Sequence, residues 1–255
     1  MATQTKGLCK YCGKECTKGG MIRHLTSCKK RQAKIETEKG KRKCGYFQII
    51  ITAKYSKEYW LIVEASENVT LNELDKFIRD IWVECCQHLS AYEINGISYE
   101  KYPSDDYMWG TPAKNMNYRL RDVVKVGDNM SYEYDFGSTT ELILNVHSYR
   151  EGVRKDDGIV ILSRNNPIEI ICSHCGQNKA EWVNPEEYYD YDGEPFWCEE
   201  CLRAESDTED DEDFYGEEFL LPVCNSPRMG VCGYEGSKKY PDQFESDKMD
   251  EKESS

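Results

Sequence analysis

The chain has 255 residues, of which 39% are hydrophobic and 31% charged, and its formal net charge at pH 7 is −14. This size suits one large or two small domains, and an acidic chain taken as a whole is unfavourable for nucleic-acid binding. No apolar run approaches the roughly 18 residues of a membrane span, and residues 1–6 lack the apolar stretch of a secretory signal. We therefore expect a cytoplasmic protein with no membrane contact. In that setting, thirteen cysteines favour metal binding over a disulfide framework.

The charge is distributed unevenly along the chain. Residues 1–43 contain 13 Lys/Arg and 3 Asp/Glu, a net charge of +10. Residues 44–202 contain 14 and 28, a net charge of −14, and residues 203–255 contain 6 and 16, a net charge of −10. A basic arm, an acidic body and an acidic tail therefore have to be considered separately.

The first cysteines have the spacing of metal ligands. Cys9 and Cys12 form a CxxC pair, and His24 and Cys28 follow at i, i+4 spacing on an expected helix, so that both can reach one ion. Over residues 8–29 the pattern resembles the C2H2 zinc-finger family in its CCHC-ligand variant. We predict a ββα-type zinc finger in residues 1–30 that binds one Zn²⁺ ion through these four residues.

A basic surface is expected beside this finger. Lysine and arginine side chains displace counterions from phosphates and so bind nucleic acid without sequence preference. The alternative is a solvated linker over residues 31–43 next to a structural finger. The residues predicted to contact DNA or RNA are Lys18, Arg23, Lys29, Lys30, Arg31, Lys34, Lys41, Arg42 and Lys43.

The acidic body, residues 44–165, begins with strand and helix signals. Residues 46–55 and 58–64 are rich in β-branched and aromatic side chains and predict a hairpin. Thr70 and Glu73 form a capping box, and the apolar residues that follow recur at helical spacing to about Cys86.

A second set of strands follows this helix. Asn95-Gly96 predicts the turn of a second hairpin. The order of hairpin, helix, hairpin and strands predicts an α+β fold, with a small sheet and one main helix in β-grasp-like order. The further predicted elements are a helical turn at 120–124 and strands at 132–136, 141–148 and 159–162.

The body contains a distinctive block at 132–137, Tyr-Glu-Tyr-Asp-Phe-Gly. Together with the strand at Trp60, the 70–82 helix and the Asn95-Gly96 turn, it resembles the plasmid pRiA4b ORF-3-like family of bacterial mobile-element passenger proteins. Family members usually continue this block with a histidine, which residues 138–142 lack. The resemblance implies an α+β fold and no established activity. Within the block, Asp135 is expected to orient the backbone of the turn.

The third segment, residues 166–203, has the clearest metal-ligand spacing. Cys172 and Cys175 form one CxxC pair, and Cys198 and Cys201 form a second. Four thiolates fill the tetrahedral coordination of zinc, which makes such a site structural. The pattern resembles the zinc-ribbon family over residues 170–203. A redox dithiol is the alternative, but two matched pairs favour one shared Zn²⁺ ion.

The remainder of the chain is expected to be a set of linkers. Residues 204–218 predict an acidic linker, residues 219–235 an apolar strap packed on the ribbon or the body, and residues 236–255 a disordered tail. The cysteines outside the two predicted sites are expected to be ordinary thiols, with the last four of them buried: Cys16, Cys44, Cys85, Cys86, Cys224 and Cys232.

The sequence predicts a non-enzymatic protein with two Zn²⁺ ions from a bacterial mobile element or defence-type locus. Residues 1–43 are expected to contact DNA or RNA, and the acidic body to contact a protein. The alternative is a protein-interaction adaptor in which both zinc sites are purely structural. No residue is assigned a catalytic role, because no phosphate loop, HExxH helix or nucleophile elbow is present. An active site assembled only by the fold is the third alternative.

Overall fold

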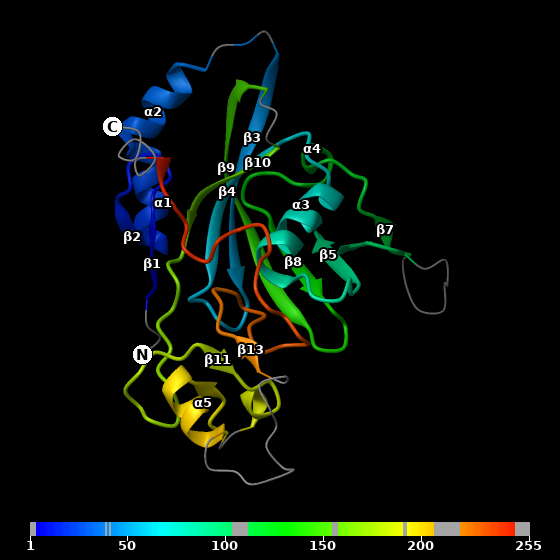
Figure 1. Cartoon of the computed structure of the whole chain (residues 1–255). Helices are drawn as coiled ribbons and strands as arrows, with labels where there is room; N and C mark the ends of the chain where they lie inside the picture. Colours follow the sequence, from blue (N-terminus) through cyan, green and yellow to red (C-terminus); the bar gives the residue numbers. More distant parts are fainter. Residues whose placement is uncertain are drawn as a thin grey trace. The chain divides into compact units, whose positions relative to one another are not determined.

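The computed structural model describes residues 4–38, 40, 42–103, 112–154, 158–190, 193–206 and 220–247. The chain forms two compact units (Figure 1). The sheet unit comprises residues 1–79, 88–166 and 243–255, and the C-terminal unit comprises residues 80–87 and 167–242. Across the described ranges, no helix is long and apolar enough to cross a membrane. The predictions for Lys41, for residues 207–219 and for residues 248–255 lie outside the described residues.

The sheet unit is α+β, as predicted, but its sheet is larger than expected. In the described part of this unit, eight strands follow the order β10-β4-β3-β9-β8-β5-β6-β7, and among them only β6 and β7 pair in parallel. The long β9 pairs with β3 on one side and with β8 on the other, which joins the two hairpins into one sheet. The strands are β3 (Lys43–Ala53), β4 (Trp60–Ser66), β5 (Ser90–Ile94), β6 (Ile97–Glu100), β7 (Lys114–Asn115), β8 (Asn129–Tyr134), β9 (Thr140–Val153) and β10 (Ile159–Arg164).

The order of hairpin, helix and hairpin is as predicted. β3 and β4 form the first hairpin, and β5 and β6 form the second. The second hairpin turns at Asn95 and Gly96, whose φ angles of 52° and 78° are the left-handed values that a two-residue turn requires. The predicted helical turn is α4 (Leu120–Val123). Local turn chemistry therefore determined these connections.

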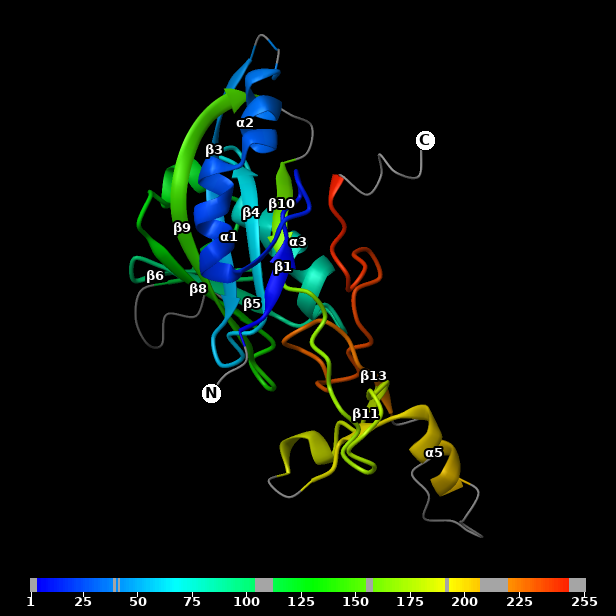
Figure 2. The same ribbon diagram turned by 90° about the vertical axis from the view of Figure 1, so that its left-hand side faces the viewer.

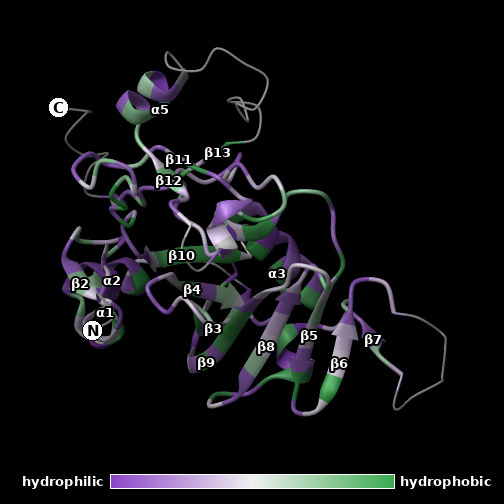
Figure 3. Ribbon diagram, turned by 90° about the horizontal axis from the view of Figure 1, so that it is seen from below, coloured by the Kyte–Doolittle hydropathy of each residue, from purple (hydrophilic) through white to green (hydrophobic). Residues whose placement is uncertain are grey.

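Helices cover the two faces of the sheet. α1 (Lys18–Ser27) and α2 (Lys29–Glu36) lie on one face, and α3 (Leu71–Ile78) lies on the other (Figures 1 and 2). Because side chains alternate along a strand, Ile50 packs in the core beside α1 while its neighbours Ile49 and Ile51 point to the opposite face, where both are fully buried. The edge strand β10 is coloured mainly hydrophobic (Figure 3), and its Leu162 is fully buried. Both faces therefore carry a hydrophobic core.

α3 begins at the predicted capping box and ends earlier than predicted. The Thr70 hydroxyl accepts a hydrogen bond from the Glu73 N–H at 3.2 Å, and the Glu73 carboxylate accepts one from the Thr70 N–H at 2.7 Å. The predicted helix to Cys86 is interrupted after Ile78 by a π-helical turn, Arg79–Val83. Such turns insert a residue into a helix and commonly occur at functional sites.

A buried carboxylate fixes the end of α3. Asp75 is fully buried and accepts hydrogen bonds from Arg79 at 2.9 Å, Lys101 at 3.0 Å and Ser90 at 2.7 Å. Arg79 also donates to the backbone carbonyl of His88 at 2.7 Å. A buried charge is tolerated only when such partners satisfy it, so this network fixes the start of the segment that leads to β5.

The C-terminal unit has a small sheet of its own. Its strands are β11 (Trp182–Val183), β12 (Phe196–Trp197) and β13 (Leu221–Pro222), and they pair in the order β12-β11-β13. The helix α5 (Glu199–Ser206) follows β12 in the chain. A 3-10 turn, Glu187–Tyr189, lies between β11 and β12. β13 comes from the predicted apolar strap and pairs with β11. The core of the unit is formed by Val183, Cys224, Met229 and Tyr234.

Part of the predicted disordered tail is structured. Within the C-terminal unit, the Asp242 carboxylate accepts a hydrogen bond from the Asn225 N–H at 2.9 Å, and the Ser237 hydroxyl accepts one from the Tyr240 N–H at 2.9 Å. The polar composition of residues 236–247 did not predict these contacts. One depends on a partner elsewhere in the unit, and the other depends on a tight local turn.

Candidate metal centres

The four predicted N-terminal ligands meet in the structure. Cys9 follows β1 (Lys6–Leu8), Cys12 lies in the turn before β2 (Glu15–Thr17), His24 lies on α1, and Cys28 ends it. One ligand atom of each lies within 4.8 Å of the others, with 4.0 Å between the sulfurs of Cys9 and Cys28 and 3.2 Å from the Cys12 sulfur to Nε2 of His24. Three sulfurs and one imidazole at these separations are consistent with a tetrahedral zinc site.

The turn that carries the CxxC pair is closed by backbone hydrogen bonds. The Gly13 N–H donates to the Cys9 carbonyl at 2.9 Å, and the Cys9 N–H donates to the Lys14 carbonyl at 3.0 Å. Gly13 has a φ of 68°, which glycine adopts without strain. The sequence Cys-x-x-Cys-Gly therefore presents both sulfurs on one side of the turn.

The surroundings of this site favour a bound cation. Burial raises the pKa of Cys9 to about 12, so its thiolate requires a nearby positive charge. Burial, with the charge of Lys14, lowers the pKa of His24, which favours the neutral imidazole that a metal binds. The donor atoms are thus of the types that zinc binds.

The N-terminal module (residues 5–36) packs directly on the large sheet. Met21 and Leu25 of α1 are buried in one core cluster with Trp60 and Ile62 of β4 and Leu162 of β10. On the scale of about 1.5–3 kcal/mol for each fully buried large apolar side chain, this contact contributes several kcal/mol. The finger-like module and the sheet consequently share a core.

The strand β1 also joins the edge of the sheet. The Lys10 N–H donates to the Leu162 carbonyl at 2.9 Å, and the Asn166 N–H donates to the Lys6 carbonyl at 2.7 Å. A Cβ on Gly7 would lie 2.0 Å from the carbonyl oxygen of Arg164, so only glycine permits this approach. Glycine at position 7 is therefore a requirement of docking, which the spacing of the ligands does not reveal.

The predicted phosphate-binding residues separate into two groups. Arg31 donates to Glu64 at 3.1 Å and to the Leu25 carbonyl at 2.9 Å, so its side chain is used inside the unit. Lys18 donates to the Thr52 hydroxyl at 3.3 Å and is half-buried. The other predicted residues within the described part of the chain are exposed: Arg23, Lys29, Lys30, Lys34, Arg42 and Lys43.

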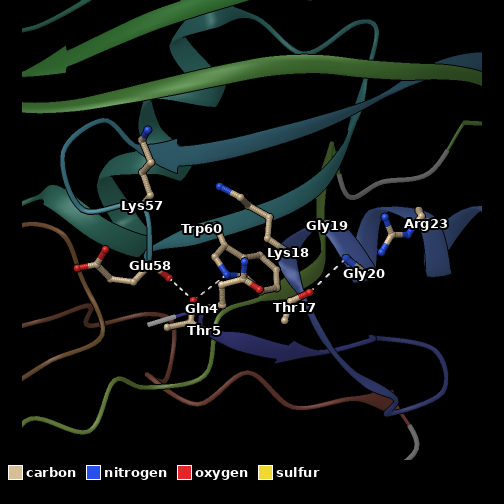
Figure 4. A pocket seen from close by; sticks show the side chains of 10 residues that line it. All are labelled: Gln4, Thr5, Thr17, Lys18, Gly19, Gly20, Arg23, Lys57, Glu58 and Trp60. Carbon is tan, nitrogen blue, oxygen red and sulfur yellow. Dashed lines mark hydrogen bonds between the residues drawn. The ribbon is translucent and has the colours of Figure 1, made fainter. Parts of the chain in front are cut away.

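A pocket of about 400 Å³ lies beside the beginning of α1 (Figure 4). Its lining includes Lys18, Arg23 and Lys57, together with Gly19 and Gly20 of the first helical turn. Burial and the charge of Lys57 lower the pKa of Lys18, as expected where cations are close together. An anion in this pocket would relieve that repulsion.

The four predicted C-terminal ligands also meet. Cys172, Cys175, Cys198 and Cys201 each place a sulfur within 4.8 Å of the others, and the sulfurs of Cys175 and Cys198 are 3.9 Å apart. The Gly176 N–H closes the first turn by donating to the Cys172 carbonyl at 3.0 Å. Cys198 and Cys201 lie at the end of β12 and the start of α5. The arrangement is consistent with a closed, four-thiolate zinc site.

Ionisation is unequal among these four thiols. Backbone N–H groups of Asn178 and Gln177 lower the pKa of Cys175 to about 6, whereas sulfur neighbours, Cys198 first, raise the pKa of Cys201 to about 12. His174 is engaged elsewhere, because its ring lies 3.3 Å from that of Trp197 and its Nδ1 lies 3.4 Å from the Glu194 carboxylate. The cluster that could hold an ion therefore consists of the four sulfurs without this histidine.

A third group of thiols was missed by sequence reasoning. Cys85, Cys86 and Cys232 all belong to the C-terminal unit, and their sulfurs lie within 4.8 Å of one another. We predicted that they would be buried, but Cys86 and Cys232 are exposed and Cys85 is half-buried. Their separation in the chain is far outside any familiar ligand spacing. Only the adjacent pair Cys85-Cys86 was a signal in the sequence.

The Tyr-Asp-Phe-Gly block forms the turn after β8. Asp135 has a φ of 65°, and its carboxylate accepts a hydrogen bond from the Gly137 N–H at 3.0 Å. The predicted role of Asp135 in orienting the turn is therefore confirmed. The same carboxylate lies 3.6 Å from Nδ1 of His88.

Residues 47–169 match the plasmid pRiA4b ORF-3-like protein family, and this part of the chain is a domain of that family. No curated protein matches the sequence. Among solved structures, the chain is similar to the protein of unknown function MM3350 from Methanosarcina mazei Go1, with 19% identity and a TM-score of 0.40. That similarity covers 47% of this chain and 68% of the archaeal chain.

Proposed function

We propose that this chain, a pRiA4b ORF-3-like domain with a cysteine module at each end, is a zinc-stabilised nucleic-acid-binding protein of a bacterial mobile element or defence-type locus. In this proposal the N-terminal module is a CCHC zinc finger that contacts the phosphates of DNA or RNA. The C-terminal module is a zinc ribbon with a structural role. The protein has no catalytic function of its own.

The observation that carries the proposal is the division of the finger into two surfaces. Met21 and Leu25 are buried against the sheet, whereas Arg23, Lys29 and Lys30 are exposed. Zinc and the sheet together would hold α1 and the following α2 in place, so the exposed cations form a fixed basic surface. Such a surface binds phosphates by releasing their counterions, without reading bases.

The pocket beside α1 supports the same function. The N–H groups at the start of a helix and its dipole favour an anion, and here Lys18, Arg23 and Lys57 add positive charge. A phosphate of a nucleic-acid backbone would occupy this pocket, and the next phosphates of the strand would lie along the exposed Arg23 of α1 and the exposed lysines of α2. The N-terminal segment would thus bind nucleic acid even though the whole chain is acidic.

The test is a binding titration with the zinc-loaded full chain and a fluorescent duplex or single strand. Replacing Lys29, Lys30 and Lys34 with Gln should lower affinity and reduce the slope of log K against log salt by about 2–3, since each lost phosphate contact contributes roughly 0.7–0.9. The matched control replaces three exposed lysines elsewhere, Lys125, Lys179 and Lys238, and leaves the slope unchanged.

The competing proposal is a protein-interaction adaptor in which both zinc sites are structural. The buried contacts of α1 also agree with this alternative, because they show the module supporting the sheet. If the two triple variants lose affinity equally, or if the wild-type chain binds no nucleic acid at low salt, the nucleic-acid proposal fails and the adaptor is favoured.

A further inference from the structure

The C-terminal unit contains three thiols that lie together outside the two predicted zinc sites. The sulfurs of Cys85, Cys86 and Cys232 lie within 4.8 Å of one another, and all three residues belong to this one unit. An ion bonded to three sulfurs at roughly 2.3 Å, the zinc–sulfur length, would place them roughly 4 Å apart in a plane. A small inward movement of the side chains would therefore give three metal–sulfur bonds.

Packing within the unit brings these cysteines together from distant parts of the chain. The Ser226 hydroxyl donates a hydrogen bond to the Trp82 carbonyl at 2.6 Å, which holds the apolar strap against the segment that follows α3. The Cys86 thiol donates to the carbonyl oxygen of Cys232 at 3.9 Å, across a separation of 146 residues in the chain. The cluster is therefore a product of the fold of this unit.

A tight turn keeps the Cys232 side chain out of the core. The Tyr234 N–H donates to the Val231 carbonyl at 3.0 Å, and the two residues between them, Cys232 and Gly233, have φ angles of 50° and 66°. Positive φ at both central positions is typical of a type I′ turn, in which Gly, Asn and Asp predominate. Val231 and Tyr234 are buried, whereas Cys232 is exposed. A cysteine in this unfavourable conformation is explained by a role for its thiol and not by burial.

A second turn fixes the adjacent pair Cys85-Cys86. The Gln87 N–H donates to the Glu84 carboxylate at 2.6 Å, and this bond closes a turn around the two cysteines. Gln87 has a φ of 60°, so the chain reverses its course directly after Cys86. Ligands held by closed turns lose little conformational freedom when they bind an ion. Both segments that contribute sulfurs are thus ordered before any ion is present.

The number and type of the donors favour a soft ion of low coordination number. Among the described residues of the C-terminal unit, this cluster provides three donors, all of them sulfur. Thiolates select Cu⁺ and Zn²⁺ over hard cations, which prefer oxygen ligands. Structural zinc fills four positions with protein ligands, as the two predicted sites would allow. The singly charged Cu⁺ ion, with its filled d shell, is instead stable with three sulfurs.

We propose that Cys85, Cys86 and Cys232 bind one Cu⁺ ion through three thiolates. Binding releases the three thiol protons to solvent, and copper stays in the +1 state, so the step needs no oxidant or reductant. Because Cys86 and Cys232 are exposed, the ion reaches the site directly from solvent. Once bound, it joins the segment after α3 to the apolar strap. The site is independent of the proposed binding of nucleic acid.

The first experiment uses the full chain with both predicted zinc sites loaded. Under anaerobic conditions, Cu⁺ is titrated in competition with a chromogenic Cu⁺ chelator while a zinc dye reports any released zinc. One Cu⁺ ion per chain should bind without release of zinc, and N-ethylmaleimide should alkylate Cys86 and Cys232 only in its absence. No uptake, or uptake only as zinc leaves, would overturn the proposal. A third zinc ion that protects both residues would overturn the choice of Cu⁺.

Variants then identify the ligands. Cys86→Ser with Cys232→Ser should abolish copper uptake and retain both zinc ions, which shows that the variant is folded. The matched control, Cys16→Ser with Cys44→Ser, should still bind one Cu⁺ ion. Unchanged copper affinity in the first variant would refute the proposed ligands.

Hydrogen exchange tests whether the ion joins the two segments. Exchange of residues 228–234 should slow when copper is added to the wild-type chain and stay the same in Cys86→Ser with Cys232→Ser. Equal exchange with and without copper in the wild type would contradict the proposed link between the strap and the segment after α3.

Discussion

The N-terminal and C-terminal cysteine modules differ in how they obtain a core. The N-terminal module places Met21 and Leu25 in the same cluster as Trp60 and Ile62 of the large sheet. The C-terminal module builds a three-stranded sheet of its own, with Val183 and Tyr234 in a separate cluster. Two sites with the same number of ligands are therefore embedded in different ways.

This difference shows what ligand spacing does and does not convey. Spacing determines whether four side chains can reach one ion, which is a local property of turns and helix faces. It does not determine whether the module is independent, because that depends on where its apolar side chains are buried. Because the N-terminal module and the sheet share a core, they should lose stability together.

The largest expected effect comes from removing zinc ligands. Cys172→Ser with Cys175→Ser should unfold the C-terminal module, because apparent zinc binding energies of about 10–16 kcal/mol exceed the contribution of so small a core. The sheet unit should keep its own unfolding transition. In contrast, Cys9→Ser with Cys12→Ser should also shift the unfolding transition of the sheet unit. Hydrogen exchange resolved by segment distinguishes the two results, and equal protection of β4 in both variants would contradict the comparison.

An intermediate effect is expected at the ion pairs that connect α2 to the sheet. Glu64 is buried and bonds to Arg31 at 3.1 Å and to Arg150 at 2.7 Å. Burial raises the pKa of Glu64, but the bonds and charges of Arg150 and Arg31 outweigh it and leave this pKa lowered. Glu64→Gln should cost about 3 kcal/mol near neutral pH, because it leaves an arginine without its partner.

The same carboxylate gives a pH dependence. A carboxyl with a lowered pKa in the folded state stabilises the protein above its unfolded pKa of about 4.3, and this stabilisation is lost as pH falls through the lower folded value. Urea unfolding of the sheet unit should therefore show a smaller loss between neutral and acidic pH in Glu64→Gln than in the wild type. Glu93→Gln, at an exposed position on β5, is the control and should behave as the wild type.

An effect of similar size is expected from the shared core. Leu25→Ala should destabilise the sheet unit by about 2–5 kcal/mol, because it removes a fully buried side chain packed near Trp60 and Ile62. Thr26→Ala, on the exposed side of the same helix, should change stability by less than about 0.5 kcal/mol. If Leu25→Ala leaves the unfolding of the sheet unit unchanged, the two regions do not fold as one.

Much of the fold was predictable because it follows from local signals. The capping box at Thr70 and Glu73 and the turn at Asn95-Gly96 each depend on neighbouring residues alone. The end of α3 was not predictable in the same way. The buried Asp75 near this end is bonded to Ser90 and Lys101, which lie 15 and 26 residues further along the chain.

By itself, the sequence determined the two sets of four Cys/His residues that meet in the structure and most strands of the α+β domain, since both arise from short-range spacing and alternation. The tertiary structure decided which predicted cations remain exposed, because the half-buried Arg31 bonds to Glu64 in a distant strand. It also decided that the N-terminal module shares the core of the sheet, and it brought Cys232 to Cys85 and Cys86. Contacts between residues far apart in the chain depend on packing, and no local pattern in the sequence records them.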